Sequence, residues 1–189
     1  QQGDPYAFGC FLTDFDIHLL GEGTHLDQYE RLGSHLVRVG ESDGVSFAVW
    51  APNAERVSVV GNFNHWDGRE HPMRNRGESG IWEIFIPGLA EGEVYKYEIR
   101  ARETGALFTK SDPFAFRFEP PPHTGSIVCA IDGYAWEDAG WMAARASRNP
   151  LETPMAVYEV HLGSWKRKSE EGNRYLTYRE LAERLGAYV

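Results

Sequence analysis

The sequence is poor in cysteine, in positive charge and in long apolar stretches. Cys10 and Cys129 are its only cysteines. Two thiols so far apart form no disulfide framework, which favours a reducing, cytoplasmic location. Lys and Arg number 19 against 28 Asp and Glu, a net charge of −9, so neither nucleic acid nor an anionic membrane is an expected partner. No apolar run in the sequence approaches the roughly 18–20 residues that span a bilayer.

Aromatic residues, glycine and proline are abundant instead. Phe, Trp and Tyr make up 13% of the 189 residues, and 20 Gly and 10 Pro interrupt the chain. Such chains are typical of β-sandwiches, whose short strands need many turns. Exposed Trp and Tyr also suit flat, hydroxyl-rich ligands such as sugars, although most aromatic side chains are expected in the core.

Alternating apolar and polar residues predict short strands throughout residues 35–131. The clearest pair, 36–39 and 45–50, flanks a turn at 42–44 and predicts a hairpin. Further strands are expected at 56–60, 81–86, 94–100, 106–110, 114–118 and 126–131. Their length and spacing indicate a mainly β fold, an immunoglobulin-like antiparallel β-sandwich. Six residues are predicted to lie in its core: Phe47, Val49, Val57, Val59, Trp82 and Ile84.

Residues 1–34 form a lead-in of mixed composition. Thr24 has the properties of an N-cap, and a short amphipathic helix is predicted at about 25–32. The sequence DPYAF at 4–8 is nearly repeated as DPFAF at 112–116, where it closes the sandwich. The first copy is interpreted as the tail of a preceding, related module, with chance or shared turn chemistry as the alternative.

The pattern changes after the three prolines at 120–122. Residues 132–154 indicate a connector with a short helix at about 138–146, and the apolar run 155–162 predicts a buried parallel strand. A capping box from Thr177 to Glu180 then opens a helix. Residues 155–189 thus hold one strand–helix unit of a (β/α)8 barrel, which needs about 250 residues, so we expect a longer parent protein.

A Gly- and Asn-rich loop, GNFNHWDG at 61–68, follows the third predicted strand. Its amides, Asn62 and Asn64, can hydrogen-bond sugar hydroxyls. With WAPNA at 50–54, YKY at 95–97 and SDPFAF at 111–116, the loop resembles the family 48 carbohydrate-binding modules, which bind α-glucan. The resemblance implies that Trp66 stacks on glucose, Lys96 bonds hydroxyls and Phe108 completes the platform. In modules fused to an enzyme, the same Trp can instead pack at the domain junction.

A second resemblance involves both ends of the chain. AVYEVHLGSW at 156–165 is similar to the first barrel strand of the branching enzymes of glycoside hydrolase family 13, and DIHLLGEG at 16–23 is similar to their lead-in. The resemblance implies a retaining mechanism that moves α-1,4-linked glucan to a 6-hydroxyl, with two carboxylates about 5–5.5 Å apart. That family places its carboxylates on later strands, so no catalytic residue is expected here. Glu159 and His161 are interpreted as filling the barrel.

These observations leave three hypotheses. In the first, the chain is the N-terminal part of a glycogen-synthesising branching enzyme, inactive by itself, whose partners are α-1,4-glucan (glycogen, starch-like chains, malto-oligosaccharides) and the catalytic domain of the same protein. In the second it is a stand-alone glucan-binding module, and in the third it precedes a debranching or trehalose-forming family 13 barrel. The terminal strand–helix unit favours an enzyme. No metal and no cofactor is expected, because the seven His show no ligand spacing with Cys.

Overall fold

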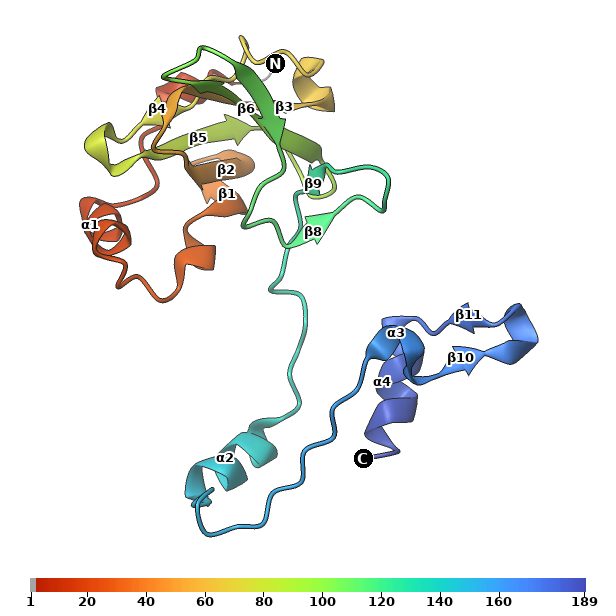
Figure 1. Ribbon diagram of the computed structural model, residues 1–189. Helices are drawn as coiled ribbons and strands as arrows, with labels where there is room; N and C mark the ends of the chain where they lie inside the picture. The colour runs from red at the N-terminus through yellow and green to blue at the C-terminus, as the bar shows by residue number, and fades with distance from the viewer. Residues whose placement is uncertain (1–2) are drawn as a thin grey trace. The chain divides into compact units, whose positions relative to one another are not determined.

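A computed structural model describes residues 3–189 of the chain (Figure 1). The described chain divides into two compact units, one ending at Tyr134 and the other spanning Ala135–Val189. The first unit contains two β-sheets and helix α1 (Asp14–Glu22), whereas the second contains three helices and a small hairpin.

Two antiparallel sheets form the first unit. The four-stranded sheet has the order β1-β2-β5-β4, with the bounds Gly33–Val39, Ser42–Trp50, Ile81–Pro87 and Arg74–Asn75. The five-stranded sheet has the order β3-β6-β9-β8, with the bounds Ala54–Gly61, Val94–Ala101, Ser126–Ile127 and Arg117–Phe118. Its fifth strand, β7 (Leu107–Lys110), also pairs with β6. The predicted antiparallel β-sandwich is confirmed.

The main core lies between the inner faces of these sheets. All six residues that the sequence predicts to be internal are buried there: Phe47, Val49, Val57, Val59, Trp82 and Ile84. They come from β2, β3 and β5, where the two-residue period of a strand sends alternate side chains to one face. The Trp82 indole N–H donates to the carbonyl of Ala51 at 3.1 Å, so its one polar atom is satisfied inside the core.

One carboxylate is buried at the end of this core. Asp112 is 1% exposed and accepts hydrogen bonds from the hydroxyls of Tyr95 (2.6 Å) and Tyr97 (3.1 Å). It also accepts from the Phe114 N–H at 2.8 Å, and its own N–H donates to Ser126 Oγ at 2.8 Å. Burial raises the pKa of Asp112, while the donated hydrogen bonds oppose that rise. The segment between β7 and β8 is thereby fixed to β6 and β9.

The strand boundaries differ from the prediction at two places. The β1–β2 hairpin turns at Gly40 and Glu41 rather than at 42–44, and Gly40 adopts the positive φ (61°) that a two-residue hairpin turn favours. The predicted strands 114–118 and 126–131 shorten to β8 and β9. The turn that Asp112 stabilises occupies the first part of 114–118, and the prolines at 120–122 cannot donate to a ladder.

The lead-in helix is α1, so the prediction of a helix at 25–32 is wrong. Thr13 caps α1 through a capping box: its hydroxyl accepts from the Asp16 N–H (3.1 Å), and the Asp16 carboxylate accepts from the Thr13 N–H (2.8 Å). The predicted segment forms only a single 3-10 turn, Gln28–Glu30, and Leu26 is 90% exposed. The predicted cap, Thr24, hydrogen-bonds Glu22 instead of a following backbone N–H.

The lead-in covers the outer face of the four-stranded sheet. Leu12 and Leu32 form a small second core there with Ile81 of β5 and with Ala48 of β2. Glu83 of β5 is buried and accepts from the backbone N–H groups of residues 11 (2.7 Å) and 12 (3.1 Å). The lead-in is therefore part of the first unit rather than a separate body.

The repeated DPYAF and DPFAF segments share one local geometry. The Asp4 carboxylate accepts from the Tyr6 N–H at 2.9 Å, as the Asp112 carboxylate does from the Phe114 N–H. Pro5–Ala7 forms a 3-10 turn. Turn chemistry is common to both copies, and the interpretation of the first as the tail of a preceding module stays a prediction.

The second unit contains α2 (Ala139–Ser147), α3 (Leu162–Trp165) and α4 (Tyr178–Gly186), with a hairpin of β10 (Arg167–Lys168) and β11 (Arg174–Tyr175). The predicted helix near 138–146 and the Thr177 capping box are confirmed. The predicted strand at 155–162 is absent: residues 155–161 form no strand, and Met155 and Val157 are exposed. A parallel strand needs a parallel neighbour, and none lies beside this segment among the described residues.

The raised pKa of Asp112 predicts a pH-dependent stability. Folding disfavours the ionised form of this carboxyl, so Asp112 destabilises the fold at a pH above its folded-state pKa. This penalty disappears as the pH falls through the folded-state pKa toward about 3.9, the ordinary pKa of an Asp side chain in the unfolded chain. Asp112→Asn removes this titration. Urea unfolding at pH 7 and pH 4 should therefore show the wild type gaining stability relative to Asp112→Asn at the lower pH. A shift of the difference in the opposite direction would contradict the assigned pKa direction.

The ion pair beneath the lead-in predicts a second effect. Arg76 contacts Glu83 and donates to the Leu12 carbonyl at 2.7 Å. Arg76→Ala leaves the buried carboxylate without its cation, and we expect a loss of about 2–4 kcal/mol in unfolding free energy and faster amide exchange in α1. The matched control is Arg38→Ala, whose exposed pair with Asp43 should be worth less than about 1 kcal/mol. Equal losses would refute the role of the buried pair.

Candidate functional site

The loop after β3 presents Trp66 in an uncommon backbone conformation. A 3-10 turn, Asn62–Asn64, is followed by His65 and Trp66, both at positive φ (54° and 61°). Positive φ costs free energy in a bulky residue and persists only where surrounding contacts fix it. Here the Trp66 N–H donates to the carbonyl of Gly61 at 2.9 Å. The indole is 40% exposed.

Asn64 is one of those contacts, and it is a positioning residue rather than a ligand contact. It is fully buried; its side-chain oxygen accepts from the Gly61 N–H (2.9 Å), and its amide nitrogen donates to the Val59 carbonyl and faces His71 Nδ1, each at 2.9 Å. Burial lowers the pKa of His71, which favours the neutral ring that can accept this bond. The amide of Asn64 is thus used inside the loop, so the geometry gives no support to the predicted contact with sugar, which stays a prediction.

Asn62 has a different role in the same loop. It is exposed, and its side-chain oxygen accepts from the Trp66 indole N–H at 2.9 Å. This bond fixes the orientation of the ring. The indole N–H lies at the ring edge, so neither face of the indole takes part in the bond. Asn62 thus lies at the candidate site, as the sequence predicts, and orients the indole.

Lys96 lies on the outer face of the five-stranded sheet, the face that the Trp66 loop crosses. Tyr95 and Tyr97 point into the core, so Lys96 and Glu98 point outward. The loop crosses this outer face: a Cβ on Gly68 would lie 2.1 Å from the Glu98 carboxylate, so Gly68 packs directly against that side chain. The Lys96 ammonium donates to the Thr124 hydroxyl at 2.7 Å and is half-buried. The structure therefore brings the Trp66 loop and Lys96 to one face.

Phe108 is not part of this face. In the β6–β7 register, Phe108 lies opposite Ile99 and Thr109 lies opposite Glu98. Directly paired residues project to the same side of a sheet, so Phe108 lies on the face opposite to Lys96, where its exposed ring is approached by Lys110 at 5.8 Å. This register does not bring Phe108 to the face of Lys96, and its predicted role as the second aromatic contact stays a prediction. Thr109 is the β7 residue that lies on the face of Lys96. The sequence does not indicate Thr109, because the pairing register of β6 and β7 cannot be determined from the sequence.

Nearby charges are paired within the protein. Arg56 donates to Glu98 at 2.5 Å, and Arg69 pairs with Asp67 at 2.5 Å, which holds the pKa of the Asp67 carboxyl well below its usual range. A face with an exposed indole, one ammonium and hydroxyl groups suits a neutral, hydroxyl-rich ligand, because C–H groups stack on the ring and the polar groups bond hydroxyls.

No group of three or more His, Cys, Asp or Glu side chains among residues 3–189 could hold a metal ion. In the same range, none of the helices has the length and apolar character needed to cross a membrane.

Comparison with known proteins agrees with this geometry. Residues 31–115 match the family model of carbohydrate-binding module 48, the isoamylase N-terminal domain. This segment is a family 48 carbohydrate-binding module. The module contains the Trp66 loop, Lys96 and Asp112, and the predicted family is thereby confirmed.

The whole chain also has close relatives. It is 56% identical over 189 residues to a 1,4-alpha-glucan branching enzyme of Roseobacter denitrificans and 55% identical over 186 residues to that of Cellvibrio japonicus. The matches cover 100% and 98% of this chain but only 26% and 25% of those proteins. The chain thus spans about a quarter of the length of these relatives. Among solved structures, apo pullulanase of Klebsiella pneumoniae overlaps 65% of the chain and 14% of its own, with a TM-score of 0.44 and 24% identity.

The two asparagines of the loop provide a matched test of their roles. Asn64→Ala leaves the Gly61 N–H and the Val59 carbonyl buried without partners, and we expect a loss of about 2–4 kcal/mol in unfolding free energy. Asn62→Ala removes only an exposed bond and should change that free energy by no more than about 0.5–1 kcal/mol. Chemical denaturation followed by fluorescence measures both. Similar losses for the two variants would contradict the assignment.

Proposed function

We propose that this chain is the N-terminal part of a 1,4-α-glucan branching enzyme, in which its family 48 module binds the glucan. The parent protein would cleave α-1,4 links and form α-1,6 branches by a retaining mechanism in cytoplasmic glycogen synthesis. The observation that carries the proposal is the outer face with Trp66, Lys96 and Thr109, within a chain about 55% identical to branching enzymes.

The module would bind linear α-1,4-glucan through Trp66. A glucose ring that stacks on the exposed indole removes apolar C–H surface from water, which is worth about 1–2 kcal/mol per ring. Lys96 would donate to hydroxyls, with a net gain of about 1 kcal/mol after competition with water and with Thr124. These gains are offset by immobilisation of the sugar, so we expect dissociation constants from high micromolar to millimolar.

The exposed apolar surface of the second unit supports the proposal that it contacts a catalytic domain of the same protein. Five of its apolar side chains are exposed: Trp136, Trp141, Leu151, Met155 and Val157. Exposed apolar surface of this extent marks an interaction site. We infer that residues 132–154 connect the module to a catalytic barrel, and that residues 155–189 are the first strand and helix of that barrel. There the run 155–162 would gain the parallel neighbour that a buried strand requires.

Binding is tested by titration of maltoheptaose into the 189-residue chain, followed by Trp fluorescence and NMR. Trp66→Ala should weaken binding about five- to thirtyfold, since it removes a stacking surface worth about 1–2 kcal/mol. Trp141→Ala, which removes a more exposed Trp (60% against 40%) from the second unit, should leave the affinity unchanged. The affinity should depend little on salt because the ligand is neutral. Equal binding by wild type and Trp66→Ala would exclude Trp66 from the site.

Catalysis should be absent from the 189-residue chain. A single strand–helix unit cannot hold two carboxylates across a glycosidic bond, and residues 155–161 here form no strand. Iodine absorbance of amylose and debranched chain-length profiles should match those of a heat-inactivated sample. Any turnover above that control would overturn the assignment of the catalytic residues to later barrel strands.

A further inference from the structure

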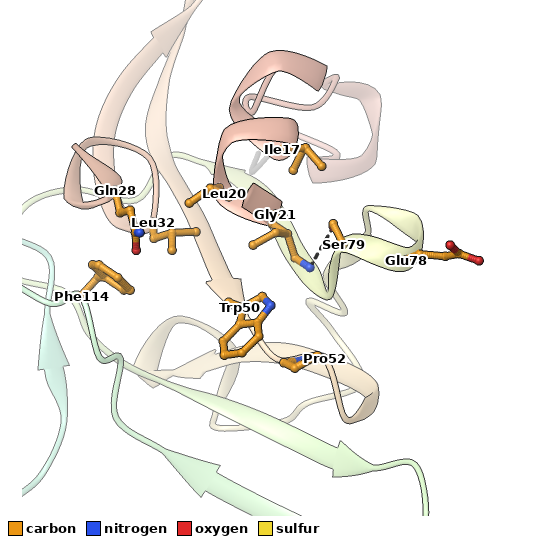
Figure 2. Close-up of a pocket in the computed structure, with 11 residues that line it drawn as sticks. Ile17, Leu20, Gly21, Gln28, Leu32, Trp50, Pro52, Glu78, Ser79 and Phe114 are labelled. Carbon is orange, nitrogen blue, oxygen red and sulfur yellow. Dashed lines mark hydrogen bonds between the residues drawn. The ribbon is translucent and has the colours of Figure 1, made fainter. Parts of the chain in front are cut away.

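A pocket of about 590 Å³ lies over the outer side of the four-stranded sheet (Figure 2). Trp50 and Phe114 flank it, and apolar side chains of α1 and of the segment before β1, Leu20 and Leu32, line its base. The volume falls within the range of about 300–1,000 Å³ that is typical of small-ligand pockets. The pocket is separate from the Trp66 face, which belongs to the other sheet.

Trp50 forms one wall of the pocket and is 61% exposed, more than Trp66. It ends β2, and the backbone that follows is fixed: the Ala51 N–H donates to the Gly80 carbonyl at 2.8 Å, and the Ala51 carbonyl accepts from the Trp82 indole. A Cβ on Gly80, which has a φ of 73°, would lie 2.8 Å from Pro52. Such close packing holds the strand end and presents the Trp50 ring from a rigid base.

The opposite wall is also preformed. Asp16 of α1 contacts His25 at 3.3 Å and Arg31 at 3.0 Å, in addition to its capping box with Thr13. These bonds outweigh the burial of Asp16 and lower its pKa, so the carboxylate keeps the segment from α1 to β1 in place at neutral pH. A preformed pocket binds a small ligand without the cost of ordering its walls.

The lining chemistry selects the class of ligand. Glu78 is the only charged side chain that lines the pocket, and it lies exposed at the rim, so nothing there would pair with an anion. Gln28 adds an amide to the lining, whereas the Ser79 hydroxyl is used within the protein, where it donates to the Arg76 carbonyl (3.0 Å) and accepts from the Ile81 N–H (3.1 Å). Flat aromatic surface with the Gln28 amide and the Glu78 carboxylate at its edge matches a sugar ring, which has apolar C–H faces and hydroxyl edges.

We propose that the Trp50 pocket is a second α-glucan subsite of this unit, a proposal that rests on the proposed glucan-binding function. The Trp50 and Trp66 sites lie over different sheets of the sandwich, so each would take its own segment of a glucan. Two sites on one body raise the affinity for long, branched glucans over short oligosaccharides, because the second contact becomes intramolecular.

The test uses the 189-residue chain labelled with ¹⁵N and with ¹³C-methyl groups, titrated with maltoheptaose. The Trp50 and Trp66 indole N–H resonances should both shift, with separate binding curves. In Trp66→Ala the Trp50 resonance should still shift with an unchanged midpoint. In Trp50→Ala the Leu20 and Leu32 methyl shifts should require roughly tenfold more sugar, while the Trp66 response persists. The Trp82 resonance, bonded to Ala51, reports that Trp50→Ala is folded.

Two outcomes would overturn the proposal in different ways. If Trp66 responds to maltoheptaose while Trp50 and the Leu20 and Leu32 methyl groups do not, the second subsite is refuted and the glucan-binding function survives. If neither Trp50 nor Trp66 responds in a folded chain, both the subsite and the glucan-binding function are refuted. Trp141→Ala serves as the matched control, since it removes a Trp of equal exposure from the other unit and should change neither curve.

Discussion

The buried carboxylate of Asp112 is the constraint on which the rest of the module depends. It accepts hydrogen bonds from two buried tyrosine hydroxyls and so connects them to the segment between β7 and β8. Its backbone N–H reaches Ser126 of β9, so one residue connects β6, the 112–116 turn and the last part of the sheet. Loss of the Asp112 carboxylate would take a buried acceptor from both tyrosine hydroxyls and from the Phe114 N–H at once, so several hydrogen bonds depend on this one side chain.

The alternation imposed by that core also decides what the outer faces present. Because Tyr95 and Tyr97 point inward, Lys96 and Glu98 must point outward. The Trp66 loop then packs over the same face through Gly68 and Glu98. A binding face therefore arises on the reverse side of the strand that carries the core tyrosines, and its position follows from the same two-residue period.

The lead-in has a comparable dependence on one buried charge. Glu83 satisfies two backbone N–H groups of the lead-in while Arg76 neutralises it, so the segment is held by both hydrogen bonds and charge. This attachment places α1 beside Trp50 and creates the pocket in Figure 2. Without it, Trp50 would stand on an open sheet face with no second wall. The lead-in therefore contributes surface to the module as well as stability.

Local patterns in the sequence were enough to determine the antiparallel sandwich, its six core residues, the Thr177 helix cap and the family to which residues 31–115 belong. These features depend on residue periodicity and on short motifs, which a sequence displays directly. Tertiary structure alone decided the rest. Strand register places Phe108 on the face opposite to Lys96, and the buried Asn64 amide makes its hydrogen bonds within the loop. The apolar run at 155–162 forms no strand because a strand exists only with a neighbour to pair with, and no local pattern can supply one.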